Sequence, residues 1–337
     1  MPTNEAATPD RTAGAPSAGF CVMACIDPSG QAARIVPHAS AIAQALGAPL
    51  TLLHALDARP AGQARPDPIE WDLRRHEARR ALSRLLSESR PASANADVAL
   101  AEGPTAHEIC RSAAAQGDGL IVLGTRARND TAQGGIGGTA HNVLSHAPGS
   151  ILLVPIDARP ASSGYHRIIV PVDGSCWAES VLPLAARIAK TADAELVLAH
   201  VVPTPELTET QPLEPEDLLL QQRVIERNEE TARFYLKRVH AYLAGMGLRV
   251  RVRSSRGDDV RATLARLIDT EAADLVILSA RGHGGCRHAD MRYGSVASYL
   301  MMHSTAPLLV MRPASADVEP AATPDYIQLR LPVAGSA

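Results

Sequence analysis

RIIVPVDGSCWAESVLPLAARIAKTADAELVLAHVV, residues 167–202, decides the fold of this chain. RIIVPVD (167–173) is a continuous apolar run rich in β-branched residues, which is typical of a parallel strand covered on both faces. Residues 176–192 follow with apolar residues at helical spacing, and AELVLAHVV (194–202) is a second buried strand. The order strand, helix, strand predicts the first βαβ unit of a parallel sheet.

The same alternation continues to residue 312 and is also found in the first half of the chain. In the second half we predict further helices over 217–246, 258–272 and 295–304, and further strands over 248–255, 274–280 and 308–312. A strand at 19–27 opens the same order and the same lengths in the first half. One structural unit is therefore used twice, with a period of about 145 residues.

These units predict the domain organisation. We expect a disordered arm over 1–18, a first domain over 19–156, a linker over 157–164, a second domain over 165–312 and a mobile tail over 313–337. Each domain should be a doubly wound α/β domain with a five-stranded parallel sheet in the flavodoxin-like order 3-2-1-4-5. In that order the ligand crevice lies between strands 1 and 4, at their carboxyl ends.

Composition excludes several classes of protein. A length of 337 residues fits two domains, and a net charge of −3 without a basic run argues against a nucleic-acid surface. No apolar run approaches the ~20 residues of a membrane span, and the first residues have no apolar signal-peptide core. Five cysteines without framework spacing are typical of reduced thiols. We therefore expect a cytoplasmic protein.

Two acidic residues and two glycine-rich loops define the candidate sites. Asp27 and Asp173 end strand 1 of their units, and the glycine-rich loops leave strand 4. Such a loop, entering a helix, presents backbone N–H groups and the positive end of the helix dipole to an anion. We expect Asp173 to bond a ribose hydroxyl and the backbone near Val201 to meet a base. Neither GxxxxGK[ST] nor GxGxxG after strand 1 is present.

The pattern resembles the universal stress protein family in its tandem form, over roughly 19–156 and 165–312. The strand-1 pattern IIVPVDGS and the ending GSVASYLMMHSTAPLLVMR carry the resemblance. The family's loop, Gly-x2-Gly-x9-Gly-Ser/Thr between strand 4 and the last helix, binds ATP in its nucleotide-binding branch when an Asp ends strand 1. The resemblance therefore implies an adenine nucleotide as ligand, and leaves an accompanying Mg²⁺ open.

Both units depart from the family's loop pattern. In the second unit Ser279 takes the first glycine position, and the gap before Gly294 is eleven residues. In the first unit Ala127 replaces the second glycine, and Gly138 takes the hydroxyl position with Thr139 one residue late. We therefore expect the nucleotide chiefly in the second unit. The expected residues are Asp173, Val201, Gly282, Gly285, Gly294 and Ser295, with the weaker set Asp27, Gly124, Gly137 and Gly138 in the first unit.

The segment HGGCRH (283–288) raises the question of a metal. His283, Cys286 and His288 are metal-ligand types, but a structural zinc site normally has four ligands. His303 or Asp290 would have to supply the fourth. An ordinary polar loop gives the same composition, so zinc is not expected.

Three function classes stay open at this point. The first is a cytoplasmic stress-response or regulatory protein that binds ATP or a related nucleotide, with Arg281 and Arg287 as candidate phosphate contacts. The second is a partner-binding scaffold whose loops no longer bind nucleotide. The third is an enzyme such as a nucleotidyl transferase, which would need a phosphate loop after strand 1. No catalytic set stands out, so we do not expect an enzyme, although slow ATP hydrolysis is left open.

Two further expectations concern the packing of the units. Family members usually pair as dimers near the last strand, and the apolar strands LLVMR and ILLVP suit such pairing within one chain. We expect an intrachain pseudo-dimer and leave a homodimer open. His54 and His200 occupy equivalent places in strand 2, where we expect histidines satisfied by hydrogen bonds. Cys21 and Cys25 are expected to be buried structural thiols.

Overall fold

The structure is a computed structural model. It describes residues 20–27, 31–57, 67–89, 95–117, 119–125, 136–159, 161, 164–205, 215–282 and 292–312. The expected arm and tail lie outside these residues. No helix of the described part is long and apolar enough to cross a membrane.

The first unit contains five strands and four helices within the described residues. They are β1 (Cys21–Cys25), α1 (Ala32–Leu46), β2 (Leu50–Leu56), α2 (Pro68–Ser89), β3 (Ala96–Glu102), α3 (Thr105–Gln116), β4 (Gly119–Thr125), α4 (Gly138–His146) and β5 (Ser150–Pro155).

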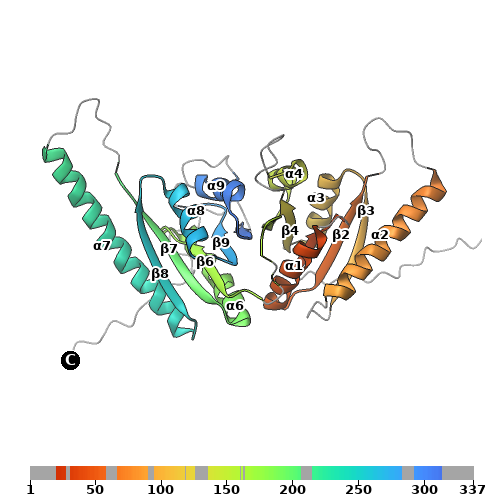
Figure 1. Cartoon of the computed structure of the whole chain (residues 1–337), viewed down its shortest axis with the longest axis horizontal. Helices are drawn as coiled ribbons and strands as arrows, with labels where there is room; N and C mark the ends of the chain where they lie inside the picture. Colours follow the sequence, from red (N-terminus) through yellow and green to blue (C-terminus); the bar gives the residue numbers. More distant parts are fainter. Residues whose placement is uncertain are drawn as a thin grey trace, which may run out of the picture.

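The second unit repeats this order. Its elements are β6 (Arg167–Pro171), α5 (Cys176–Glu179), α6 (Leu182–Ala192), β7 (Glu195–Pro203), α7 (Pro215–Gly245), β8 (Val250–Gly257), α8 (Val260–Thr270), β9 (Leu275–Ser279), α9 (Ser295–His303) and β10 (Leu308–Met311). Figure 1 shows the two units side by side, with the long helices α2 and α7 at the outer ends.

The strand order agrees with the prediction. Ten strands of the described chain form one sheet in the order β3-β2-β1-β4-β5-β10-β9-β6-β7-β8. Each unit therefore has the order 3-2-1-4-5, and its own strands are parallel. The carboxyl ends of β1 and β4, and of β6 and β9, are the places where the connections diverge and leave a crevice.

The two units join through their last strands. β5 and β10 pair in antiparallel register, with Leu309 opposite Leu152. This pairing makes one continuous sheet from two parallel halves. It confirms the intrachain pairing predicted from the apolar strands ILLVP and LLVMR.

Two apolar cores cover the two faces of the sheet. On one face α1, α2, α6 and α7 contribute side chains such as Ile42, Leu82, Ile188 and Leu236. On the other, α3, α4, α8 and α9 contribute Ile109, Leu144, Leu264 and Leu300. Both cores extend across both units. Because the central strands are covered on both faces, they are apolar along most of their length, whereas the edge strand β8 alternates.

One predicted helix is wrong in its continuity. The sequence predicted a single helix over 176–192, but the structure breaks it at Ser180 and Val181, between α5 and α6. Pro183 lies in the first turn of α6, where its missing N–H costs nothing, but within a continuous helix it would leave the carbonyl of Glu179 without a donor. The other predicted elements lie within a few residues of the observed ones.

Candidate functional site

A cavity of about 520 Å³ lies where the second unit's crevice was predicted. It opens at the carboxyl ends of β6 and β9, beside the first turn of α9. Five of the six residues predicted for this unit line it: Asp173, Val201, Gly282, Gly294 and Ser295. Gly285 lies outside the described residues, as does Arg287, whereas Arg281 also lines the cavity.

Asp173 is held in a fixed orientation at the end of β6. The backbone N–H of Ser175 donates to Oδ1 of Asp173 at 3.0 Å and the Ser175 hydroxyl donates to the same oxygen at 2.6 Å. The Ser175 hydroxyl in turn accepts from the N–H of Ala178 at 3.1 Å and caps α5. Asp173 and the helix that follows it are thus coupled through one hydroxyl.

Gly282 is a glycine because Asp173 lies against it. A Cβ at position 282 would lie 2.6 Å from Oδ2 of Asp173, closer than any Cβ contact allows. The carboxylate and the start of the glycine-rich loop are therefore in van der Waals contact across the crevice. This places the acid and the loop around one ligand position.

The first turn of α9 forms the anion-accepting side of the cavity. Gly294 is the N-cap residue of α9 and no side chain caps the turn. The N–H groups of Ser295, Val296 and Ala297 have no acceptor within the helix, and all three residues line the cavity. The N–H of Gly294 donates to the carbonyl of Ala280 at 2.7 Å, which fixes the turn against the end of β9. Such a turn attracts phosphate or carboxylate groups.

The remaining wall of this cavity is largely apolar. Val201 in β7 is 7% exposed, and it lines the cavity together with Val260, Leu264 and Leu278. The cavity therefore offers donors at one side and a hydrophobic surface at the other, as ligand sites with a few placed polar groups usually do.

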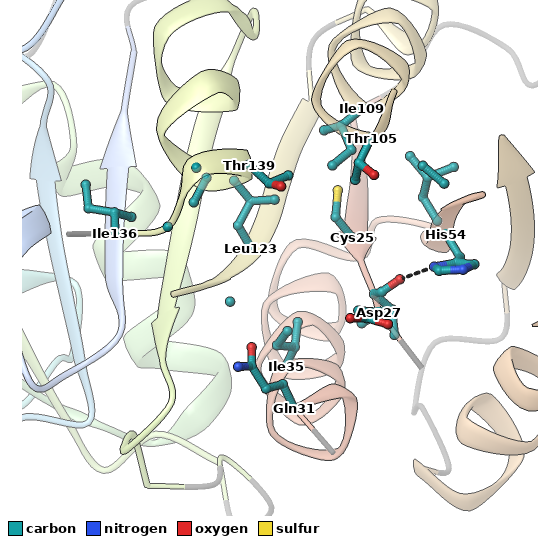
Figure 2. A pocket seen from close by; sticks show the side chains of 17 residues that line it. Cys25, Asp27, Gln31, Ile35, His54, Thr105, Ile109, Leu123, Ile136 and Thr139 are labelled. Atoms are coloured by element: carbon teal, nitrogen blue, oxygen red, sulfur yellow. Dashed lines mark hydrogen bonds between the residues drawn. The ribbon is translucent and has the colours of Figure 1, made fainter. Parts of the chain in front are cut away.

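The first unit has a corresponding cavity of about 490 Å³ (Figure 2). Its predicted residues Asp27, Gly124, Gly137 and Gly138 all line it. Thr139 and Cys25 also line it, as do two polar residues that the sequence analysis did not name, Gln31 and Thr105. Gln31 begins the turn before α1 and Thr105 begins α3, so helix starts facing strand ends were the signal that could have found them.

The glycines of the first cavity have different reasons for being there. Gly137 has a φ of +98°, which disfavours any residue with a side chain, and it is the N-cap residue of α4. Gly124 is needed for close packing, because a Cβ there would lie 2.8 Å from Cδ1 of Ile35. Gly138 has open space around it, and the hydroxyl of the helix start comes one residue later, from Thr139.

The strand-2 histidines are satisfied by hydrogen bonds, as predicted. Nδ1 of His54 lies 2.8 Å from the carbonyl oxygen of Ile26, and Nδ1 of His200 lies 2.7 Å from that of Val172. Both rings are half-buried. Cys21 and Cys25 were expected to be buried, but the structure leaves both half-buried. Desolvation nevertheless raises the pKa of the Cys25 thiol, so this thiol stays protonated.

Most of the residues considered as metal ligands, which were not expected to bind one, lie outside the described part of the chain. His283, Cys286, His288 and Asp290 lie outside the described residues. Nδ1 of His303 lies 2.8 Å from the carbonyl oxygen of Tyr299, and the two rings stack with centroids 4.0 Å apart. Within the described part of the chain, no group of three or more His, Cys, Asp or Glu residues is arranged to hold a metal.

Fold and sites together define a class: a doubled α/β protein with a cavity at the switch point of each half. The family model of the universal stress protein family matches residues 21–155 and 164–312. The chain therefore belongs to the universal stress protein family and carries two of its domains in tandem, as its sequence indicated.

Known relatives cover nearly the whole chain. A universal stress protein from Mycolicibacterium smegmatis is 25% identical over 306 residues, which are 87% of this chain and 97% of the relative. The structure of a universal stress protein from Archaeoglobus fulgidus matches with a TM-score of 0.59 at 17% identity, over 86% of this chain and 98% of that chain. A functionally unknown protein from Pseudomonas aeruginosa matches with a TM-score of 0.60 at 18% identity, over 89% and 95%. At 17% and 18% identity, both structural matches show the shared fold alone.

Proposed function

We propose that the second unit binds an adenine nucleotide, ATP foremost, and that the protein acts as a cytoplasmic regulatory protein of the stress response. The observation that carries this proposal is the meeting of Asp173, Gly282 and the first turn of α9 around one cavity. Its volume of about 520 Å³ falls in the range of roughly 300–1,000 Å³ that small-molecule sites occupy.

Each part of the cavity suits one part of the nucleotide. The N–H groups of Ser295 to Ala297 and the guanidinium of Arg281 suit the phosphates. Asp173, at the end of β6, suits a ribose hydroxyl, and the apolar wall around Val201 and Leu264 suits the flat base.

We propose binding rather than catalysis as the primary activity. The Ser175 hydroxyl, which donates to Asp173 at 2.6 Å, also accepts from the N–H of Ala178 and so serves as the cap of α5. The first unit supports a second candidate, a scaffold role. Gly138 stands there in place of the hydroxyl residue that Ser295 supplies in the second unit.

Calorimetric titration of ATP, with and without Mg²⁺, tests the proposal. The variants are Asp173→Ala and Ser295→Ala, with Asp27→Ala in the first unit as the matched control. Loss of one charge-assisted or donor contact should raise the Kd about tenfold in the first two variants. The control should keep the wild-type affinity. Equal binding by all four proteins would remove the site, and no binding by the wild type would favour the scaffold.

A further inference from the structure

Arg312 follows β10 of the second unit, but its side chain contacts helix α4 of the first unit. Its Nη2 donates to the carbonyl oxygen of Leu144 at 2.8 Å, and its Nη1 donates to that of Ala147. Both carbonyls belong to the carboxyl end of α4, where the helix itself supplies no donors. A guanidinium there also complements the negative end of the helix dipole. The Arg312 side chain therefore supplies donors to the carboxyl end of a helix in the other unit.

The same guanidinium holds Tyr293. Nη2 of Arg312 donates to the Tyr293 hydroxyl at 2.5 Å, and that hydroxyl donates to the carbonyl of Leu144 at 3.1 Å. The guanidinium carbon also lies 4.9 Å from the centre of the Tyr293 ring. Tyr293 directly precedes Gly294 and lines the second cavity. Arg312, Tyr293 and the end of α4 thus form one hydrogen-bonded group, which we name the Arg312 clamp.

The clamp is built in one direction only. Gly137 and Gly294 are equivalent N-cap residues, so Ile136 takes the place of Tyr293 in the first unit. Leu152 and Leu309 face each other across the antiparallel pair, so Pro155, three residues after Leu152, takes the place of Arg312. Isoleucine and proline have no side-chain donor. At the equivalent positions among the described residues, the first cavity therefore lacks the two side chains that brace the second.

The clamp also fixes the backbone that follows β10. The N–H of Arg312 donates to the hydroxyl of Ser150 in β5 at 3.2 Å, where Pro155 has no N–H to offer in return. Arg312 is anchored by its main chain and its side chain. Because both its main chain and its side chain are hydrogen-bonded to the first unit, Arg312 is a fixed partner for the Tyr293 hydroxyl.

We propose that Arg312 and Tyr293 are positioning residues for the anion-accepting turn at Gly294 and Ser295. The nucleotide affinity of the second unit then depends on α4 of the first. The inference rests on the proposed function for its ligand. Its physical basis is preorganisation, since a turn that is fixed before the ligand arrives spares the ordering entropy on binding.

The affinity test uses the full chain with Arg312→Ala, Tyr293→Phe and the double variant. Each single change should weaken ATP binding roughly three- to tenfold, and the double variant should be no weaker than Arg312→Ala, because the two side chains act as one unit. Arg249→Ala is the matched control. Its guanidinium pairs with the exposed carboxylate of Asp193 at the opposite end of the strands, and its affinity should be unchanged. If Arg312→Ala does not fold, Tyr293→Phe carries the test.

Amide hydrogen exchange provides a readout that does not need ATP. Arg312→Ala should speed exchange at the amides of Ser295 to Ala297 and in the last turn of α4, and Arg249→Ala should not. A wild type that fails to bind ATP would remove the proposed function, and the exchange data would still decide the clamp. Unchanged exchange at both places would overturn the clamp. So would unchanged affinity in both clamp variants when Asp173→Ala does weaken binding.

Discussion

The Nδ1 atom of His200 lies 2.7 Å from the carbonyl oxygen of Val172, the residue directly before Asp173. His54 repeats this contact with Ile26, directly before Asp27, at 2.8 Å. A carbonyl only accepts, so Nδ1 must be the donor in both. The histidine of β7 therefore holds the backbone just after β6, and the histidine of β2 holds the backbone just after β1. In each unit this contact orients the aspartate that follows.

Replacing His200 by leucine should remove the hydrogen bond that holds the backbone at Val172. The Val172 carbonyl would lose its partner, so we expect the free energy of unfolding to fall by about 1–3 kcal/mol and ATP binding to weaken. Urea unfolding measures the first effect and calorimetry the second. His166→Leu is the control, because its ring is exposed and should cost about 0.5 kcal/mol or less. Equal costs in the two variants would show that the bond does not stabilise the fold.

Sequence predicted most of the fold because the buried strands are apolar along their length. Runs such as RIIVP and LVILS fix both the strand and its burial, and the duplication gives every element twice. The break between α5 and α6 was missed because the apolar spacing continues through Ser180 and Val181. Pro183 has no N–H to donate within a continuous helix, and this ends the helix despite the apolar spacing.

The candidate sites were predicted where residue type alone carries the information. Asp173, Gly282 and Ser295 have recognisable places after a strand or before a helix, and the cavity brings them together. Arg312 and Tyr293 could not be predicted. Their partners are main-chain carbonyls of Leu144 and Ala147, more than a hundred residues away, and a carbonyl has no signature in the sequence.

Gly282→Ala should weaken nucleotide binding while leaving the fold in place. The new Cβ would lie 2.6 Å from Oδ2 of Asp173, so the carboxylate or the loop must move. We expect the Kd for ATP to rise about tenfold, since a misplaced carboxylate loses a hydrogen bond. Calorimetry measures this change. Gly245→Ala is the control because a Cβ there meets nothing within 4 Å. A Gly282→Ala variant with wild-type affinity would place the ligand away from Asp173.

A buried histidine of α1, His38, contacts the connection between the units and should make stability depend on pH. Nδ1 of His38 lies 3.1 Å from the hydroxyl of Tyr165, and Nε2 lies 3.0 Å from the carbonyl oxygen of Arg159. The ring is 1% exposed. Burial lowers the pKa of His38 to about 4, against the opposing effects of the Arg159 carbonyl and of Asp274. The folded protein therefore holds this ring neutral.

The sign of the pH effect follows from the unfolded chain, where a histidine has a pKa of about 6.5. As pH falls from about 6.5 to about 4, the unfolded chain takes up a proton that the folded chain refuses, and stability is lost. Over this whole pH range, the free energy of unfolding should fall by about 3 kcal/mol. His38→Gln should flatten the fall in unfolding free energy between pH 7 and pH 4.5, measured in urea, and His166→Gln should keep it. A wild-type slope in His38→Gln would contradict the prediction.

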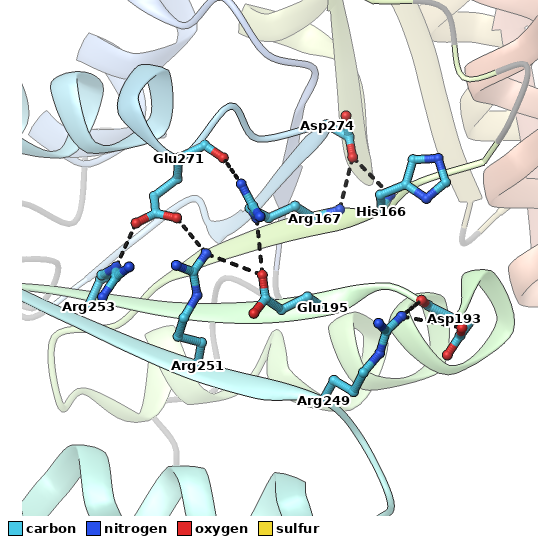
Figure 3. Close-up of polar contacts among 9 residues, drawn as sticks. All are labelled: His166, Arg167, Asp193, Glu195, Arg249, Arg251, Arg253, Glu271 and Asp274. Atoms are coloured by element: carbon cyan, nitrogen blue, oxygen red, sulfur yellow. Dashed lines mark hydrogen bonds and ion pairs between the residues drawn. The ribbon is translucent and has the colours of Figure 1, made fainter.

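The amino ends of the second unit's strands carry an ion-pair network far from the cavity (Figure 3). Arg251 bridges Glu195 at 3.2 Å and Glu271 at 2.5 Å, and Arg253 donates to Glu271 at 2.6 Å. The Glu271 side chain is 11% exposed. Burial acts to raise the pKa of Glu271, but Arg253 and Arg251 outweigh it and leave the pKa lowered. Glu271 therefore stays ionised and fastens the end of α8 to β8.

Glu271→Gln should cost stability at neutral pH without touching nucleotide binding. Two arginines would lose a charged partner, so we expect the free energy of unfolding to fall by about 1–3 kcal/mol. Since the folded pKa is lowered, the stability from this group is fully present above the ordinary glutamate pKa of about 4.3, and it is lost as pH falls from there through the lower folded pKa. The difference between the two proteins should shrink over that range. Asp193→Asn is the control, because its carboxylate is 95% exposed in its pair with Arg249 and should contribute about 0.5 kcal/mol or less. A changed Kd for ATP in Glu271→Gln would show that the two ends of the sheet are coupled, against this prediction.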